Sequence, residues 1–162
     1  DNWPVPEMLR DAVISEDGLY RYRLTRRWDD GDQVTFVMLN PSTADANEDD
    51  PTLRRCIRFA QAWGYAALSV VNLYAYRATN PDDLWRTADP IGVDNDSHLC
   101  AAGESGDLLV AAWGGNAKLK RIEQILSLPG FSRINYLRLT KAGQPSHPLY
   151  LPKDLTPIPW LH

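Results

Sequence analysis

The chain has 162 residues, with 17 Lys and Arg against 21 Asp and Glu, which gives a formal net charge of -4. This length suffices for one well-packed core, so we expect a single domain over residues 1–162. The composition, 44% hydrophobic and 23% charged, excludes disordered, collagen-like and coiled-coil chains. No apolar run approaches the roughly 20 residues that span a bilayer, so we expect no membrane partner.

The two cysteines, Cys56 and Cys100, stand between apolar residues and lack the spacing that binds zinc or an iron–sulfur cluster. We therefore expect no metal and no cofactor. The first residues, Asp1 to Pro4, show no basic stretch followed by an apolar one, so no secretory signal is predicted. A reducing, cytoplasmic location is expected.

The N-terminal half predicts two strands followed by a helix. Residues 19–24 alternate apolar and charged side chains, which is typical of a half-buried strand, and the polar run 28–32 predicts a hairpin turn. The continuous apolar run 34–39 predicts a strand that is buried on both faces. A helix is then expected to begin with Asp50 as N-cap and Pro51 at the first position, and to stop at Gly64.

This predicted helix is amphipathic. Its apolar side chains recur at helical spacing and form a buried stripe, namely Leu53, Cys56, Ile57, Ala60 and Trp63. Its arginines fall together on the exposed side and give the helix a basic face, namely Arg54, Arg55 and Arg58.

The C-terminal half continues the alternation of strands and helices. Strands are predicted over 68–73, 107–113 and 135–139, and helices over 82–86, 93–102 and 117–128, the last capped by Asn116. Beyond residue 140 the chain is rich in proline and predicted to be irregular, apart from the element 147–151. This alternation predicts an α/β fold, a three-layer α/β/α sandwich with a central, mostly parallel four-stranded sheet and an N-terminal β-hairpin.

Polar residues follow the predicted parallel strands where each strand ends. Asn40 follows the first strand, Asn72 lies near the end of the second, and the Gly-Gly-Asn turn 114–116 follows the third. Ligands of open α/β sheets bind beyond these carboxyl ends, so we expect the three positions to converge on one crevice together with His147. Three of these residues also have a structural interpretation: Asn40 as a turn initiator, Asn72 as a satisfied buried amide and His147 as a structural histidine.

Four short motifs occur in order along the chain: Leu39-Asn40-Pro41-Ser42, Val70-Val71-Asn72, residues 108–117 and His147-Pro148-Leu149. Together they resemble the uracil-DNA glycosylase superfamily, whose corresponding motifs are Ile-Asn-Pro-Gly in the mismatch-specific branch, Leu-Leu-Leu-Asn, Leu-Leu-Trp-Gly-x-x-Ala and His-Pro-Ser-Pro-Leu. The segments Asn-Pro-Ser-Thr-Ala-Asp, Val-Asn-Leu-Tyr-Ala-Tyr-Arg-Ala and His-Pro-Leu-Tyr-Leu resemble more closely still the uncharacterised bacterial and phage family known as domain of unknown function 1643.

The resemblance implies a monofunctional DNA glycosylase, acting as a monomer on a modified or mismatched base, with a pyrimidine favoured. Asn40 would hold the attacking water with its amide oxygen and could contact the base, and His147 would donate a hydrogen bond to the base oxygen. Asn72 would read the edge of the flipped base. Ser42 stands where the uracil-specific branch has a Tyr that blocks the methyl group of thymine, so a larger pyrimidine would fit.

The same resemblance implies contacts to the rest of the DNA. Tyr74 or Tyr76 would stack on the flipped base, and Leu149 or Leu151 would act as the wedge. Phosphate contacts are expected from the basic residues of the two predicted helices, namely Arg54, Arg55, Arg58, Lys118, Lys120 and Arg121.

Two other classes of function stay open at this point. The chain could be a nucleic-acid-binding module without chemistry, or a hydrolase of free nucleosides or nucleotides, because a fold resemblance does not choose among them. The net charge excludes neither, because it averages segments of opposite sign: residues 117–141 hold six basic residues and one acid, and 43–50 hold four acids and no base. Local fields, more than net charge, decide whether a phosphate backbone docks.

Overall fold

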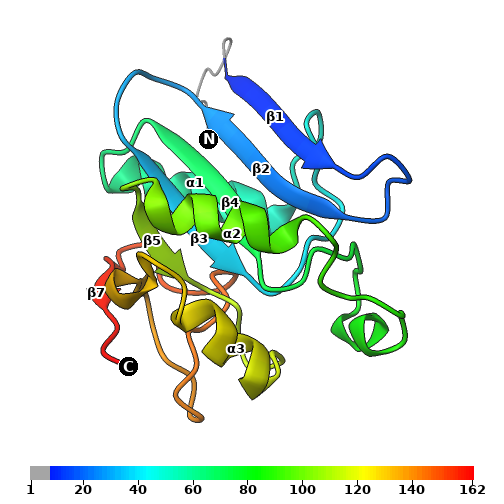
Figure 1. Ribbon diagram of the computed structural model, residues 1–162. Helices are drawn as coiled ribbons and strands as arrows, with labels where there is room; N and C mark the ends of the chain where they lie inside the picture. Colours follow the sequence, from blue (N-terminus) through cyan, green and yellow to red (C-terminus); the bar gives the residue numbers. More distant parts are fainter. Residues whose placement is uncertain (1–7) are drawn as a thin grey trace.

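The computed structural model describes residues 8–162, and over this range the chain forms a seven-stranded mixed sheet and three α-helices (Figure 1). The strands are β1 (Leu9–Ile14), β2 (Arg21–Arg27), β3 (Gln33–Met38), β4 (Ala67–Asn72), β5 (Leu108–Ala111), β6 (Asn135–Tyr136) and β7 (Ile158–Pro159). The helices are α1 (Pro51–Ala62), α2 (Asn95–Glu104) and α3 (Leu119–Leu126), with two 3₁₀ helices, η1 (Pro81–Trp85) and η2 (Phe131–Arg133). The start of the chain, on which the expectation of no secretory signal depends, lies outside the described residues.

The strand order is β1-β2-β4-β3-β5-β6-β7, so the sheet is wider than the four strands predicted. The neighbours β4, β3, β5 and β6 pair in parallel, whereas β1 with β2, β2 with β4, and β6 with β7 pair antiparallel. Parallel strands direct their carboxyl ends to the same edge of a sheet. The segments that follow β3, β4 and β5 therefore begin side by side.

Helices cover both faces of the sheet. Alternate residues of β3 point to opposite faces, as the period of a strand requires. Phe36 shares a core with the buried side of α1, whereas Val37 shares a second core with Leu99 of α2 and Ile122 of α3. In Figure 1, α1 and α2 accordingly lie on opposite sides of the strands.

Helix α1 begins and ends where the sequence predicts. The carboxylate of Asp50 accepts a hydrogen bond from the backbone N–H of Leu53 at 2.8 Å, and Pro51 occupies the first helical position. Gly64, just beyond the helix, has a φ of 83°, a conformation that glycine adopts without strain. The predicted buried stripe is confirmed for Leu53, Cys56, Ile57 and Ala60, whereas Trp63 is only partly buried.

The N-terminal hairpin is present, but its partner strand was predicted wrongly. The turn at 28–32 does not fold β2 back onto β3, because β4 lies between these two strands. The hairpin is instead formed by β1 and β2, and its loop is closed by the backbone N–H of Ser15 donating to Tyr20 at 2.8 Å. The physical reason is that β3 is apolar on both faces and takes an interior position between β4 and β5, while the amphipathic β2 lies farther out.

One further prediction is wrong towards the C-terminus, and one strand there was not predicted. Asn116 does not cap α3, because this helix begins at Leu119 with Lys118 at the N-cap and no side-chain capping bond. The element 147–151 forms turns, and the unpredicted strand β7 arises from backbone pairing with β6, a long-range contact that leaves no periodic pattern. Across residues 8–162, none of the helices combines the length and the apolar character needed to span a bilayer.

Candidate functional site

A cavity of about 360 Å³ lies at the carboxyl ends of β3, β4 and β5, against the first turns of α1. We call it the edge cavity. Four of the predicted site residues line it, namely Asn40, Ser42, Asn72 and His147, together with the turn 114–116. The structure thus brings together residues that are more than a hundred positions apart in the sequence.

Asn40 follows β3 and is half-buried. Its side-chain Nδ2 donates to the backbone oxygens of Pro41 at 2.9 Å and of Ala78 at 2.7 Å. An amide nitrogen has two N–H donors, so these bonds use both of them and fix the orientation of the side chain. The amide oxygen is what Asn40 can still offer to a water molecule or a ligand.

Asn72 is the last residue of β4 and is completely buried, with 0% of its surface exposed. Within residues 8–162, neither its Nδ2 nor its Oδ1 has a hydrogen-bond partner. A buried polar group left unpaired costs about 1–3 kcal/mol, and such exceptions in folded proteins call for an explanation. One planar amide in the cavity wall thus has both a donor and an acceptor without a partner in the described residues.

His147 stands at the exposed rim of the edge cavity. Its Nδ1 accepts a hydrogen bond from the backbone N–H of Leu149 at 3.3 Å, which leaves the proton of the neutral ring on Nε2. Partial burial of the ring lowers the pKa of His147 from its ordinary value of 6.5, and the charge of Asp50 opposes this shift. At neutral pH, His147 is therefore a neutral N–H donor.

Arg21, which the sequence did not single out, also lines the edge cavity. Only 4% of its surface is exposed, its Nη1 donates to the backbone oxygen of Ala44 at 2.8 Å, and its Nε has no partner within the described residues. Desolvation lowers the pKa of Arg21 to about 10, with the charge of Asp50 opposing the shift. The guanidinium therefore stays positively charged at neutral pH.

A β-bulge directs Arg21 into this cavity. Along β1, Val13 pairs with Arg23 but the next residue, Ile14, pairs with Arg21, so Tyr22 is an extra residue in β2. The extra residue breaks the alternation of the strand. Arg21 and Leu24 consequently both line the edge cavity, while Tyr22 stacks on His98 of α2 with ring centroids 5.4 Å apart.

The predicted stacking residues lie elsewhere. Tyr74 is buried, its hydroxyl accepts from the backbone N–H of Lys118 at 3.2 Å, and its ring contacts Trp85 edge-on. Tyr76 packs against Tyr20. Apart from the imidazole of His147, the aromatic side chain that the structure places in the cavity wall is Trp113, which the sequence indicated only as a core residue.

Two of the predicted DNA contacts are incompatible with their positions. Arg121 is buried: its Nε donates to the backbone oxygen of Leu73 at 2.8 Å and its Nη2 pairs with Asp96 at 2.7 Å. The guanidinium thus ties α3 to the end of β4 and does not face solvent. Of the two candidates for the wedge, Leu151 is buried in the core beneath α1, whereas Leu149 is partly exposed.

Lys118 and Lys120 are exposed but lie away from the edge cavity. Lys118 lies over the ring of Trp85, with its Nζ 4.6 Å from the ring centroid. Both lysines border a separate depression beside Trp85 and α3, and neither lines the edge cavity.

The lining of the edge cavity offers little covalent or metal chemistry. Burial raises the pKa of the Cys56 thiol, so it stays protonated and is a weak nucleophile. Asp50 is engaged as the N-cap of α1. Over the described part of the chain, no three His, Cys, Asp or Glu side chains are grouped as a metal site would require.

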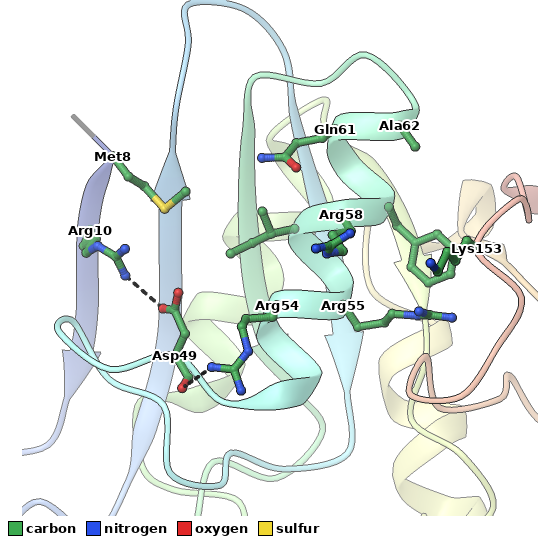
Figure 2. A pocket seen from close by; sticks show the side chains of 11 residues that line it. Met8, Arg10, Asp49, Arg54, Arg55, Arg58, Gln61, Ala62 and Lys153 are labelled. Atoms are coloured by element: carbon green, nitrogen blue, oxygen red, sulfur yellow. Dashed lines mark hydrogen bonds and ion pairs between the residues drawn. The ribbon is translucent and has the colours of Figure 1, made fainter. Parts of the chain in front are cut away.

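A second cavity, of about 520 Å³, lies over the outer side of α1, and we call it the outer groove (Figure 2). Its lining includes Asp49 and five basic side chains, namely Arg10, Arg54, Arg55, Arg58 and Lys153. The predicted basic face of α1 is therefore present, and it is extended by Arg10 of β1 and by Lys153 of the C-terminal segment.

Comparison with known proteins places the chain in a family. The model of a family described as protein of unknown function, DUF1643, matches residues 21–149. Neither a curated protein nor a solved structure matches the chain. The matched segment contains Arg21, Asn40, Asn72 and His147, all of which line the edge cavity. The chain belongs to the DUF1643 family.

Proposed function

We propose that the chain is a DNA glycosylase that hydrolyses the N-glycosidic bond of a modified or mismatched base flipped out of DNA. The observation that carries the proposal is the unpaired amide of Asn72, buried in a cavity of about 360 Å³. The edge of a pyrimidine presents a donor beside an acceptor, which one planar amide complements. The cavity volume lies near the lower end of the range for small-molecule sites, roughly 300–1,000 Å³, and suits a single base.

Asn40 supplies the position of the attacking water. Its amide oxygen accepts a hydrogen bond from the water, whose oxygen forms a bond to the anomeric carbon of the sugar. The bond from that carbon to the base breaks, the electron pair leaves with the base, and the water gives up a proton to solvent. An amide is too weak a base to take that proton itself, so slow turnover is expected.

The departing base carries negative charge, and two groups are suited to stabilise it. The Nε2–H of neutral His147 can donate to a base oxygen, and one donor of this kind contributes roughly 10²- to 10³-fold in rate. The buried guanidinium of Arg21 adds a positive charge in a desolvated setting, where charges act more strongly than in water. Both groups favour the transition state over the neutral bound base.

The shape of the cavity bears on which base is accepted. Ser42 lines the cavity, and its side chain is small enough to leave room for a substituent at C5 of a pyrimidine. Trp113 supplies a flat wall in place of the predicted tyrosines. We therefore favour a 5-substituted pyrimidine as the substrate.

The resemblance to the uracil-DNA glycosylase superfamily is part of this proposal. Parallel pairing among β4, β3, β5 and β6, with cores on both faces, supports a three-layer sandwich around four parallel strands. A DNA partner, a monomeric state and a cytoplasmic location likewise belong to the proposal.

The test is a panel of oligonucleotides containing uracil, hypoxanthine or 5-substituted pyrimidines in single strands, matched duplexes and mismatches, assayed for alkali-labile abasic sites. We expect wild-type protein to release at least one of these bases. Asn40→Ala and His147→Ala should lose release while retaining DNA binding. Asn47→Ala, which changes an exposed asparagine outside the cavity, should behave as wild type.

Other outcomes identify the competing functions. DNA binding without release of any base would overturn the proposal in favour of a binding module. Cleavage of free nucleosides at least as fast as of oligonucleotides would favour a nucleoside hydrolase. Wild-type rates in both cavity variants would contradict the assignment of the site.

A further inference from the structure

We propose that the outer groove binds the phosphodiester backbone of the nucleic-acid strand that carries the target base. The substrate is then a polynucleotide and not a free nucleoside. The assignment of a target base rests on the proposed function. The binding of a nucleic-acid strand in the outer groove does not depend on it. The groove adds Arg10 and Lys153 to the arginines of α1, and neither residue is part of the edge cavity.

The described lining of the groove contains five cationic side chains and one carboxylate, Asp49, which is already paired. Asp49 pairs with Arg10 at 3.0 Å and also with Arg26 at 2.9 Å. The side chain of Arg26 is fully buried and cannot serve a ligand, so it neutralises Asp49 from within the protein. Arg10 is therefore not required to neutralise Asp49.

Arg55 is held in a fixed position at the groove. Its guanidinium lies over the ring of Phe59, with its Cζ 5.4 Å from the ring centroid. Its Nε is buried and has no hydrogen-bond partner within residues 8–162. A guanidinium that is oriented by packing against a ring loses less entropy when it binds an anion.

The cations are spread along a path and not gathered around one point. Arg54 and Arg58 are one helical turn apart, about 6 Å along the axis of α1. Figure 2 shows Arg10 on one side of this helix and Lys153 on the other. One small anion cannot contact cations on both sides of a helix, whereas a chain of phosphates can.

The groove and the edge cavity share the N-terminal half of α1. Thr52 and Leu53 line the edge cavity, and the next two residues, Arg54 and Arg55, line the groove. A strand whose base occupies the cavity can therefore continue across the groove. Four of the five cations are arginines, whose planar guanidinium matches a phosphate with two hydrogen bonds.

The test is the affinity of Arg54→Ala/Arg58→Ala for a fluorescent oligonucleotide, measured by anisotropy over a range of salt concentrations. We expect the Kd at low salt to rise about tenfold, and the slope of log Kd against log salt to fall by about 1.4 for a single strand, because two phosphate contacts are lost. The matched control, Arg86→Ala/Lys141→Ala, removes two exposed positive charges outside the groove and should bind as wild type.

Equal weakening by both double variants, or by neither, would overturn the inference. Binding of anionic phospholipid vesicles in place of the oligonucleotide would overturn it in favour of a membrane surface.

A second experiment compares the KM for a target base in a free nucleoside with the KM for the same base in oligonucleotides of increasing length. KM should fall with oligonucleotide length in wild type but not in Arg54→Ala/Arg58→Ala. If wild type releases no base, the proposed function fails. The anisotropy measurements on the two double variants still show whether the outer groove binds the strand.

Discussion

The edge cavity and the outer groove border the same half of α1 but contain different kinds of polar group. In the cavity, Asn40 is oriented by two backbone oxygens, Asn72 is buried and unpaired, and Arg21 is withdrawn from solvent. In the groove, long cationic side chains such as Arg54 and Lys153 are exposed. Fixed groups in a desolvated site distinguish one ligand from another, whereas exposed charges provide affinity that salt screens. Under the proposed function, this contrast assigns base selection to the edge cavity and strand binding to the outer groove.

The largest effect is expected at Asn40. Asn40→Ala should lower the single-turnover rate of base release by roughly 10²- to 10³-fold, because the attacking water loses its positioning acceptor. The Kd for the oligonucleotide should stay within about twofold of wild type, because the groove is intact. A parallel loss of affinity would break the separation between the two sites.

Arg21 should affect the rate less and in a way that depends on the leaving group. Arg21→Gln removes a buried positive charge from the cavity, so bases that leave as poorly stabilised anions should slow most. We expect about a tenfold loss for uracil and a smaller loss for 5-fluorouracil, whose anion is more stable. Arg21→Lys should restore part of the rate. An identical loss for both bases in Arg21→Gln would indicate a purely structural role.

Arg121 should affect folding and not DNA binding. Arg121→Ala removes the hydrogen bond to the backbone oxygen of Leu73 and the pair with Asp96, and leaves that oxygen with only the longer bond, 3.3 Å, from Nδ2 of Asn95. We expect a loss of about 1–3 kcal/mol in the free energy of unfolding, measured by denaturant titration. The salt dependence of DNA binding should match wild type, in contrast to Arg54→Ala/Arg58→Ala. A reduced slope would place Arg121 among the phosphate contacts after all.

The smallest effect is a loss of stability on acidification. Burial lowers the pKa of both His147 and His98 below their ordinary value of 6.5 in the folded state. The unfolded chain therefore binds more protons in the window between the folded pKa values and 6.5, and stability falls as the pH falls through it. The Tm of the wild type should fall as the pH is lowered through this window, and the Tm of His98→Gln/His147→Gln should fall less. An unchanged slope in that double variant would exclude these two groups as the cause.

What could be predicted from the sequence was specified locally. The bounds of α1 follow from Asp50, Pro51 and Gly64. Each of these residues lies at, or next to, the helix end that it determines. The convergence of Asn40 and Asn72 follows from each standing at the end of an apolar strand, since such strands are interior and parallel.

The remaining features depend on contacts between distant segments. The position of Arg21 is set by a bulge opposite β1, and the charged alternation of β2 alone indicates an exposed side chain. Arg121 was assigned to the surface because basic residues are normally solvated, but Leu73 and Asp96 come from elements that the sequence of α3 does not reveal. Strand β7 consists of two residues that pair with β6 through the backbone, and no side-chain pattern predicts such a short strand.

The most direct test of the account is a paired measurement on Asn72→Leu, which keeps the size of the side chain and removes its polar atoms. If the buried amide is unpaired and kept for a ligand, the variant should be more stable by about 1–3 kcal/mol, with a higher Tm, and should release no base. A lower Tm together with wild-type base release would show that Asn72 is a structural amide, and would contradict the account.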